Sequence, residues 1–229
     1  MKAGTIEAIF RYPVKSMQGE KLEKAVTKEY GIEGDRIFAW EKQNSPGKHL
    51  TIPELPSLLS YKVRLDQNQQ LSILKGSQSC SVSQLEEELS RKSGTNVNLV
   101  DIDPNGNGPA YWDSPLLITT TASLKEIEKA SRRDDLDILR FRPNLIVELA
   151  DNTPFQEESW IGKVITMGEV ILYVKKGCER CAYVNVDPAT QEIDTGVLKI
   201  VMVENKMTFG VYATVVRSGH INQSDEIHI

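Results

Sequence analysis

Residues 165–186 read ITMGEVILYVKKGCERCAYVNV, and this stretch decides the fold class. Its apolar and β-branched segments Val170–Val174 and Ala182–Val186 predict strands on both sides of a pair of cysteines. Further strand-like segments continue from Ile165 to the C-terminus. The second half of the chain is therefore predicted to be mostly β.

Outward from this stretch, short apolar runs alternate with turn residues, and helical periodicity is confined to two segments before it. One is 83–94, where Ser83 is expected to cap the helix and Gly94 to end it, and the other is 123–131. The strand-like segments are 4–12, 21–30, 37–40, 61–73, 116–119 and 145–149. The predicted fold class is mostly β with a few helices, an α+β arrangement.

A run of flexible and turn-forming residues, Asn105–Pro109 (NGNGP), is the best candidate for a domain boundary because it shows no apolar periodicity. It predicts a β-rich N-terminal domain over residues 1–104 and a second domain over residues 105–229.

The composition limits the classes of function. A net charge of −5 argues against a general nucleic-acid surface, although two or three converging basic groups would still bind a small anion. The N-terminus lacks the apolar core of a signal peptide and no apolar run is long enough to span a bilayer, so we expect a cytoplasmic protein without a membrane partner. An odd number of cysteines, 3, suits a reducing compartment.

Two of the cysteines, Cys178 and Cys181, lie close together beside Lys175, Lys176 and Arg180. Positive neighbours favour the thiolate, which is the form that attacks or binds metal. The strands predicted on both sides disfavour a disulfide-exchange site, which needs the pair at a helix start, and a structural zinc site would need a second ligand pair. A functional thiol and a buried structural thiol stay open alternatives for Cys181, and the structural one is preferred for Cys178 and Cys80.

Arginines occupy two positions of the segment Arg140-Phe141-Arg142-Pro143-Asn144. Pro143 favours an extended Arg142, so we expect both guanidinium groups to project to the same side. They would hold phosphate or carboxylate, or else form a surface pair beside the acidic residues that precede them. The second alternative is preferred on these residues alone.

Near the N-terminus, Lys15 and Ser16 follow a predicted strand, and Asp35-Arg36 forms a local pair of opposite charges. Each is compatible with an anion site and equally with an ordinary solvated turn. The histidines form no catalytic constellation, and no phosphate-binding glycine loop is present.

Several short motifs, taken together and in their order along the chain, resemble the MOSC family. Within that family the resemblance is to the branch of the mitochondrial amidoxime-reducing component and its bacterial relatives. The resemblance covers nearly the whole chain. The motifs are Tyr12-Pro13-Val14-Lys15-Ser16, Gly34-Asp35-Arg36, Asp113-Ser114-Pro115-Leu116, Arg140-Phe141-Arg142-Pro143-Asn144, Cys178-Glu179-Arg180-Cys181, Val186-Asp187-Pro188 and Phe209-Gly210-Val211-Tyr212.

The resemblance implies a MOSC β-barrel with a smaller N-terminal β-barrel-like domain and a molybdenum-molybdopterin cofactor between them. By the family's pattern, Cys181 would be the metal ligand and the catalytic residue. Lys15, Ser16, Arg36, Arg142 and Asn144 would hold the pterin and its phosphate, and Thr120 and Ser123 are weaker candidates for the same role. A family-level link to pyridoxal phosphate binding is also implied.

The function implied by the resemblance is a molybdenum-dependent reductase of N-hydroxylated small molecules, such as hydroxylamino-purines or amidoximes, acting by oxygen-atom transfer. No further cysteine set for an iron–sulfur cluster is present, so a separate flavin or iron–sulfur protein would supply electrons. The segment Thr51-Ile52-Pro53-Glu54 lacks an arginine that longer relatives tend to carry, which bears on the substrate. The alternatives are a sulfur or cofactor carrier that uses a Cys181 persulfide, and a structural domain with a buried thiol pair.

Overall fold

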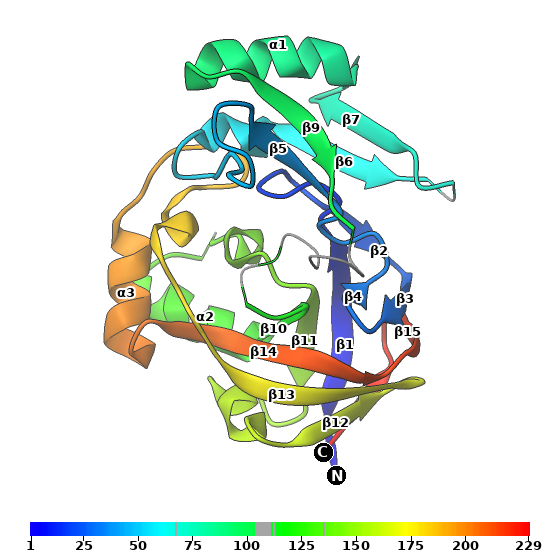
Figure 1. The fold of residues 1–229 in the computed structure, drawn as a ribbon. Coiled ribbons are helices and arrows are strands. Elements are labelled where there is room, and N and C mark those ends of the chain that lie inside the picture. Colours follow the sequence, from blue (N-terminus) through cyan, green and yellow to red (C-terminus); the bar gives the residue numbers. More distant parts are fainter. Residues whose placement is uncertain (67, 104–110, 112, 135) are drawn as a thin grey trace.

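The computed structural model describes residues 1–66, 68–103, 111, 113–134 and 136–229. Its main body is a barrel of seven strands in the order β11-β10-β14-β13-β12-β16-β1, closed by pairing of β1 with β11 (Figure 1). Closure leaves the ring without a free edge. The strands are β1 (Lys2–Arg11), β10 (Leu116–Thr120), β11 (Leu145–Leu149), β12 (Val164–Met167), β13 (Val170–Glu179), β14 (Thr208–Arg217) and β16 (Glu226–His228).

The mostly β fold with a barrel confirms the predicted fold class. Alternate residues of the strands point inward and form one apolar core, which includes Ile9, Val147, Leu172 and Val211. The first strand of the chain, β1, lies between β11 and β16, and the short strand β2 (Glu20–Leu22) is attached to its far half. The predicted boundary at Asn105–Pro109 lies outside the described residues.

Residues between β1 and β10 build a smaller lobe with its own core around Trp40, Tyr61 and Leu89 (Figure 1). One of its sheets pairs β5 (Phe38–Lys42) with β9 (Val97–Asp101), and the other has the order β6-β7-β8, from Tyr61–Leu65, Leu71–Lys75 and Gln78–Cys80. A third sheet, β15-β3-β4, joins Gly219–Asn222 near the C-terminus to Lys24–Lys28 and Gly31–Ile32.

Helix α1 (Val82–Ser93) covers the smaller lobe by burying Leu85 and Leu89 on one face. Gly94 ends it in the left-handed conformation, as predicted. The expected cap at Ser83 is wrong, because the Ser81 hydroxyl accepts from the Gln84 backbone N–H and the Gln84 side chain accepts from the Ser81 N–H. This reciprocal capping box satisfies two groups at once. Among the described residues, no helix is both long and apolar enough to cross a membrane.

Two further helices pack together beside the barrel, α2 (Thr121–Ser131) and α3 (Gly196–Asn205) (Figure 1). The α3 segment lies in the region from Ile165 to the C-terminus for which a series of strands was predicted, and there the prediction is wrong. Its buried residues Val197 and Val201 are four apart, so they face the same cluster as Phe209. The strand predicted over Ala182–Val186 is also wrong, because Ala182–Asn185 forms a short 3-10 helix, η4.

The two lobes meet at a small apolar cluster of Ile52, Leu59 and Val186, with Tyr183 packed against it. The 3-10 helix η1 (Pro56–Ser60) supplies the lobe side of this contact and the segment after β13 supplies the barrel side. The chain just beyond Cys181 therefore lies where barrel and lobe join.

Candidate functional site

Cys181 comes two residues after β13 ends and is exposed, whereas Cys178 at the end of the strand is buried. Cys181 occupies the N-cap position of η4, and its carbonyl accepts from the Val184 N–H at 3.2 Å. The register between β13 and β14 is irregular from Gly177 to Glu179, where the strand leaves the barrel wall. The change from strand to 3-10 turn presents one thiol outward and keeps the other inside.

Two arginines predicted for the site, Arg36 and Arg142, stack on the ring of Tyr12. Their guanidinium carbons lie 5.0 and 4.3 Å from the ring centroid. The buried Tyr12 hydroxyl donates to the Pro143 carbonyl at 3.0 Å, which fixes the ring. The negative ring face attracts each cation and brings like charges together at the junction of the lobes.

Arg142 is held in place but is not neutralised. Its Nη1 donates to the Met17 carbonyl at 2.8 Å, whereas its buried Nη2 has no hydrogen-bond partner among the described residues. Burial, followed by the nearby Arg36, lowers the pKa of Arg142 to about 10, so the side chain stays charged at neutral pH. An unpaired buried donor costs about 1–3 kcal/mol, so an anion at Nη2 would be strongly favoured.

Lys15 extends the positive cluster. Its Nζ lies 3.3 Å from Nδ1 of His49, a contact that requires a neutral imidazole as acceptor. Burial and then Arg36 lower the pKa of Lys15, while burial and then Lys15 lower the pKa of His49. Ser16 is buried beside it, and its Oγ donates to the Leu50 carbonyl at 3.2 Å.

Among the described residues, the carboxylate that forms an ion pair with this cluster is Asp35, which pairs with Arg36 and also accepts from the Tyr12 backbone N–H at 2.7 Å. Within the described part of the chain, neither Lys15 nor Arg142 has a carboxylate within ion-pair distance. Asn144 joins the cluster to the barrel, because its Oδ1 accepts from Arg36 at 3.4 Å and from the Leu117 N–H at 3.2 Å.

Two tyrosines connect the cysteine segment to the positive cluster. Tyr183 lies within electrostatic range of both Cys181 and Arg142, forms a hydrogen bond with Thr51, and has its pKa raised mainly by burial. Tyr212 hydrogen-bonds Cys178 and lies within range of Arg36, and its pKa is raised, again mainly by burial. The structure thus brings Cys181, Lys15, Ser16, Arg36, Arg142 and Asn144 into one region.

The Thr120 and Ser123 hydroxyls form a hydrogen-bond network with Glu157. Thr120 ends β10, three residues beyond the Leu117 carbonyl that receives the Asn144 N–H, and caps α2 through the Ser123 N–H. Both hydroxyls donate to the buried carboxylate of Glu157, at 3.1 and 2.9 Å. Burial raises the pKa of Glu157. These residues form a buried network at the start of α2, and the hydrogen bonds of their hydroxyls within the described residues go to one another, to Glu157 and to the Phe155 N–H.

Arg140 does not share a side with Arg142, contrary to the prediction. Residues Ile138–Phe141 form the 3-10 helix η2, and Arg142 has a left-handed backbone with φ 57° instead of the extended one that Pro143 favours. The Arg140 side chain is buried and paired, because Nη1 donates to the Val184 carbonyl and Nη2 to Asp187, each at 2.9 Å. It is not the surface pair preferred from sequence.

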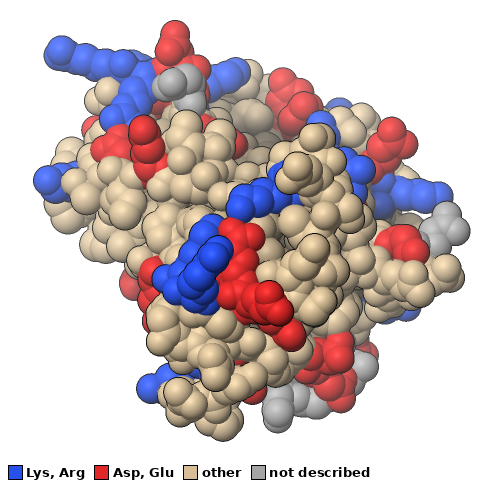
Figure 2. All heavy atoms as spheres, turned by 90° about the horizontal axis from the view of Figure 1, so that it is seen from above, with Lys and Arg blue, Asp and Glu red and all other residues tan. Residues whose placement is uncertain are grey.

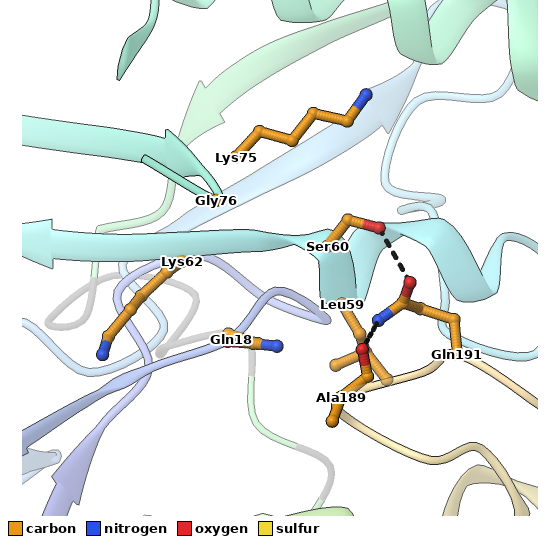
Figure 3. A pocket seen from close by; sticks show the side chains of 8 residues that line it. All are labelled: Gln18, Leu59, Ser60, Lys62, Lys75, Gly76, Ala189 and Gln191. Carbon is orange, nitrogen blue, oxygen red and sulfur yellow. Dashed lines mark hydrogen bonds between the residues drawn. The ribbon is translucent and has the colours of Figure 1, made fainter. Parts of the chain in front are cut away.

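A polar pocket lies between β6–β7 and the segment 188–191, and none of the predicted site residues lines it (Figure 3). The Gln18 amide donates to the Pro188 carbonyl at 2.8 Å, and Ser60 donates to Gln191 at 3.2 Å. These bonds hold the chain after η4 to the smaller lobe. Figure 2 shows basic and acidic side chains side by side on the face seen from above, so positive charge on that face is interspersed with negative.

Sequence reasoning missed Tyr12, Tyr183 and Tyr212 as parts of this region. Tyr12 stands in a motif that was recognised for its lysine and serine, and nothing in the sequence shows that its ring contacts two distant arginines. The positions of Tyr183 and Tyr212 beside this cluster could not be predicted from local sequence, because the residues that they contact come from separate strands and from the smaller lobe.

Comparison with known proteins gives two domain matches. The model of the MOSC domain matches residues 70–228, and that of the MOSC N-terminal beta barrel domain matches residues 3–116. Mitochondrial amidoxime-reducing component 1 of Danio rerio is 38% identical over 89 residues, which is 38% of this chain and 26% of that protein. Molybdenum cofactor sulfurase of Caenorhabditis briggsae is 32% identical over 122 residues, or 52% of this chain and 17% of that protein. The matched regions are thus a minor part of both curated relatives.

Among solved structures, the YUAD protein from Bacillus subtilis is similar in fold. The TM-score is 0.55 over 99% of this chain and 94% of that one, with 12% sequence identity. At this identity the likeness concerns the fold alone.

Proposed function

Because this chain belongs to the MOSC family, we propose that it binds a molybdenum-molybdopterin cofactor and reduces N-hydroxylated small molecules. The observation that carries the proposal is the exposed thiol of Cys181 near a partly buried cluster of cations. Tyr183 lies between them, within electrostatic range of both Cys181 and Arg142, and the cluster has fewer negative than positive charges. One relative named for amidoxime reduction and one named for the molybdenum cofactor support the same general chemistry.

The residues present fit such a cofactor. A phosphate would supply the missing negative charge to Lys15, Arg36 and Arg142 and a partner for Arg142 Nη2. The described residues contain no group of three or more histidine, cysteine or acidic side chains suited to a metal ion. A metal at Cys181 would therefore take most of its ligands from a small molecule, as a dithiolene would provide, and a soft thiolate suits that set.

Each side chain then has a task. Lys15, Arg36 and Arg142 hold the phosphate, Ser16 and Asn144 shape the pocket around them, and Cys181 is the protein ligand of molybdenum. When bound, the group supplies oxygen-atom transfer chemistry. Burial raises the pKa of Tyr183 further above its ordinary value of 10.0, so its hydroxyl keeps its proton at neutral pH and can donate a hydrogen bond to a substrate oriented beside Cys181. A separate flavin or iron–sulfur protein delivers electrons to this site.

A second candidate is a sulfur or cofactor carrier in which Cys181 holds a persulfide. The similarity to molybdenum cofactor sulfurase of Caenorhabditis briggsae favours this alternative, since that protein matches 52% of this chain. The two functions differ in turnover: a carrier binds or transfers without reducing a substrate, whereas a reductase consumes one substrate for every two electrons.

The test is expression in a host that makes the molybdenum cofactor and, as control, in a strain that cannot. Molybdenum and pterin content are measured, followed by reduction of a hydroxylamino-purine and of an amidoxime with a chemical electron donor. We expect loaded protein to reduce at least one of them and control protein to reduce neither. Loaded protein without turnover would favour the carrier, and protein without molybdenum or pterin from the competent host would overturn the proposal. Pyridoxal phosphate binding stays a prediction.

A further inference from the structure

Two arginines outside the positive cluster connect its segment to the cysteine segment. Arg180 precedes Cys181, yet its side chain turns back into the protein and is buried. Its Nη1 donates to Sγ of Cys178 at 2.7 Å and its Nη2 to the Phe141 carbonyl at 2.6 Å. Phe141 directly precedes Arg142, so this side chain connects the backbone on one side of Cys181 to the backbone beside the anion-binding arginine.

Arg140 makes the reverse connection from the other segment. Arg140 directly precedes Phe141 in the chain. Its side chain donates to two groups that follow Cys181 in the sequence, the Val184 carbonyl of η4 and the Asp187 carboxylate, each at 2.9 Å. Both guanidinium groups use their two Nη atoms on two partners, and both leave Nε without a partner among the described residues. The segments are thus joined twice, before Cys181 by Arg180 and after it by Arg140.

We propose that Arg140 and Arg180 form a crossed clamp that sets the position of Cys181 relative to Arg142. The inference rests on the proposed function, in which the thiolate holds the metal and Arg142 holds the phosphate of one rigid cofactor. A rigid cofactor can contact the Cys181 thiolate and Arg142 together only when the distance between these two groups matches its own length. A small displacement of either group would therefore weaken cofactor binding. Arg140 and Arg180 would act through the backbone on either side of Cys181 and beside Arg142, and are therefore positioning residues.

The packing around the clamp explains why both positions carry arginine. Arg180 lies over the ring of Phe141 at 5.4 Å, and Phe141 stacks on Phe209 with ring centroids 3.9 Å apart. A planar guanidinium can stack and donate in two directions, whereas the ammonium of lysine is a point charge on a flexible stem. Arg→Lys keeps the charge and removes the two-point connection, so it isolates the clamp from electrostatics.

The test measures the surroundings of the Cys181 thiol in cofactor-free protein, with Cys80→Ser as the common background because Cys80 is partly accessible and Cys178 is buried. The rates of alkylation by anionic iodoacetate and by neutral iodoacetamide are compared. Their ratio, relative to that of a free thiol, reports how closely the thiol is held to Lys15, Arg36 and Arg142, and the thiolate fraction cancels. Arg180→Lys and Arg140→Lys are compared with Arg64→Lys, an exposed arginine on β6.

We expect the ratio to be raised in the parent protein, to fall at least threefold in each clamp variant, and to stay unchanged in Arg64→Lys. A general loss of stability would change both rates together and leave the ratio as it was. If an arginine variant does not fold, Asp187→Asn weakens the Arg140 connection at the partly exposed rim and serves the same test. An unchanged ratio in the folded clamp variants would overturn the inference.

Molybdenum content separates failure of the clamp from failure of the function. If parent protein from the competent host contains molybdenum but the clamp variants show the parent's ratio and content, the clamp is wrong and the function stands. If the parent contains none, the function fails, whatever the alkylation ratio shows.

Discussion

Replacement of Lys15 by methionine is expected to act in opposite directions on anion binding and on the stability of the anion-free protein. The lysine brings a positive charge into a region that already holds Arg36 and Arg142, and burial together with Arg36 lowers its pKa. Folding therefore costs free energy as long as Lys15 is charged. A bound anion would offset this cost by attracting the ammonium group. Methionine is similar in length and lacks the charge.

The loss of anion binding is set by the donors that Lys15 has free. One of its three ammonium hydrogens is directed to His49, which leaves donors for a phosphate. A hydrogen bond to a charged group is worth about 1.5–3 kcal/mol, so Lys15→Met should weaken phosphate binding roughly 10- to 150-fold. A phosphate concentration that stabilises wild type by about 2.7 kcal/mol would stabilise a variant of hundredfold weaker affinity by about 0.4 kcal/mol.

The assay is urea unfolding of cofactor-free protein with and without inorganic phosphate, across pH 6–10. Since the folded pKa of Lys15 lies below its unfolded value of 10.5, the folded state binds fewer protons between the two. Wild-type stability therefore rises with pH in that interval, and the advantage of Lys15→Met, present below the folded pKa, disappears toward pH 10.5.

Lys24→Met, at an exposed position of β3, is the matched control and should leave both quantities unchanged. Undiminished phosphate stabilisation in Lys15→Met would remove Lys15 from the site. A variant less stable than wild type without phosphate at neutral pH would refute the argument from uncompensated charge.

Three further outcomes are expected. Cys181→Ser should lose molybdenum and turnover with the fold intact, while Cys178→Ser keeps most of both; equal losses, by metal analysis and activity, would point to a two-thiol site. Tyr12→Phe should retain phosphate binding in calorimetry, whereas Tyr12→Leu should lose it because each cation–π contact is worth about 0.5–2 kcal/mol; similar affinities would contradict the stacking role. Burial raises the folded pKa of Glu157 above 4.5, so wild type should lose stability relative to Glu157→Gln as pH rises through that interval, and a pH-independent difference in urea titrations would argue against it.

Local patterns predicted the elements whose pattern and packing agree. Leu145–Leu149 is a strand with the predicted bounds, and helix α1 ends at Gly94 as predicted. Prediction failed where tertiary contacts override propensity: the Val-rich α3 is helical because its buried face meets α2 and Phe209.

The candidate site was predictable as a set of residue types but not as a geometry. Three of its residues have a left-handed backbone, which residues other than glycine rarely adopt: φ is 68° at Ser16, 52° at Arg36 and 57° at Arg142. Such backbones are selected by surrounding contacts, among them the Met17 carbonyl that receives Arg142. Local sequence rules predict an extended backbone at Arg142, before Pro143. This is why the side chains of Arg140 and Arg142 were wrongly predicted to project to the same side.

The place of β1 in the barrel has a consequence for the order in which the chain folds during synthesis. This strand precedes the other six strands of the ring in the sequence, and its two neighbours in the ring, β11 and β16, follow more than a hundred residues later, with β16 at residues 226–228. The ring can close only after residues 226–228 have left the ribosome, whereas the core of the smaller lobe and its described sheets β5-β9 and β6-β7-β8 come from residues before 102. Contacts of such sequence separation form slowly. A nascent chain would thus carry the core of the smaller lobe beside a strand β1 that is paired only with the short β2, and we expect the protein to depend most on chaperones at this stage.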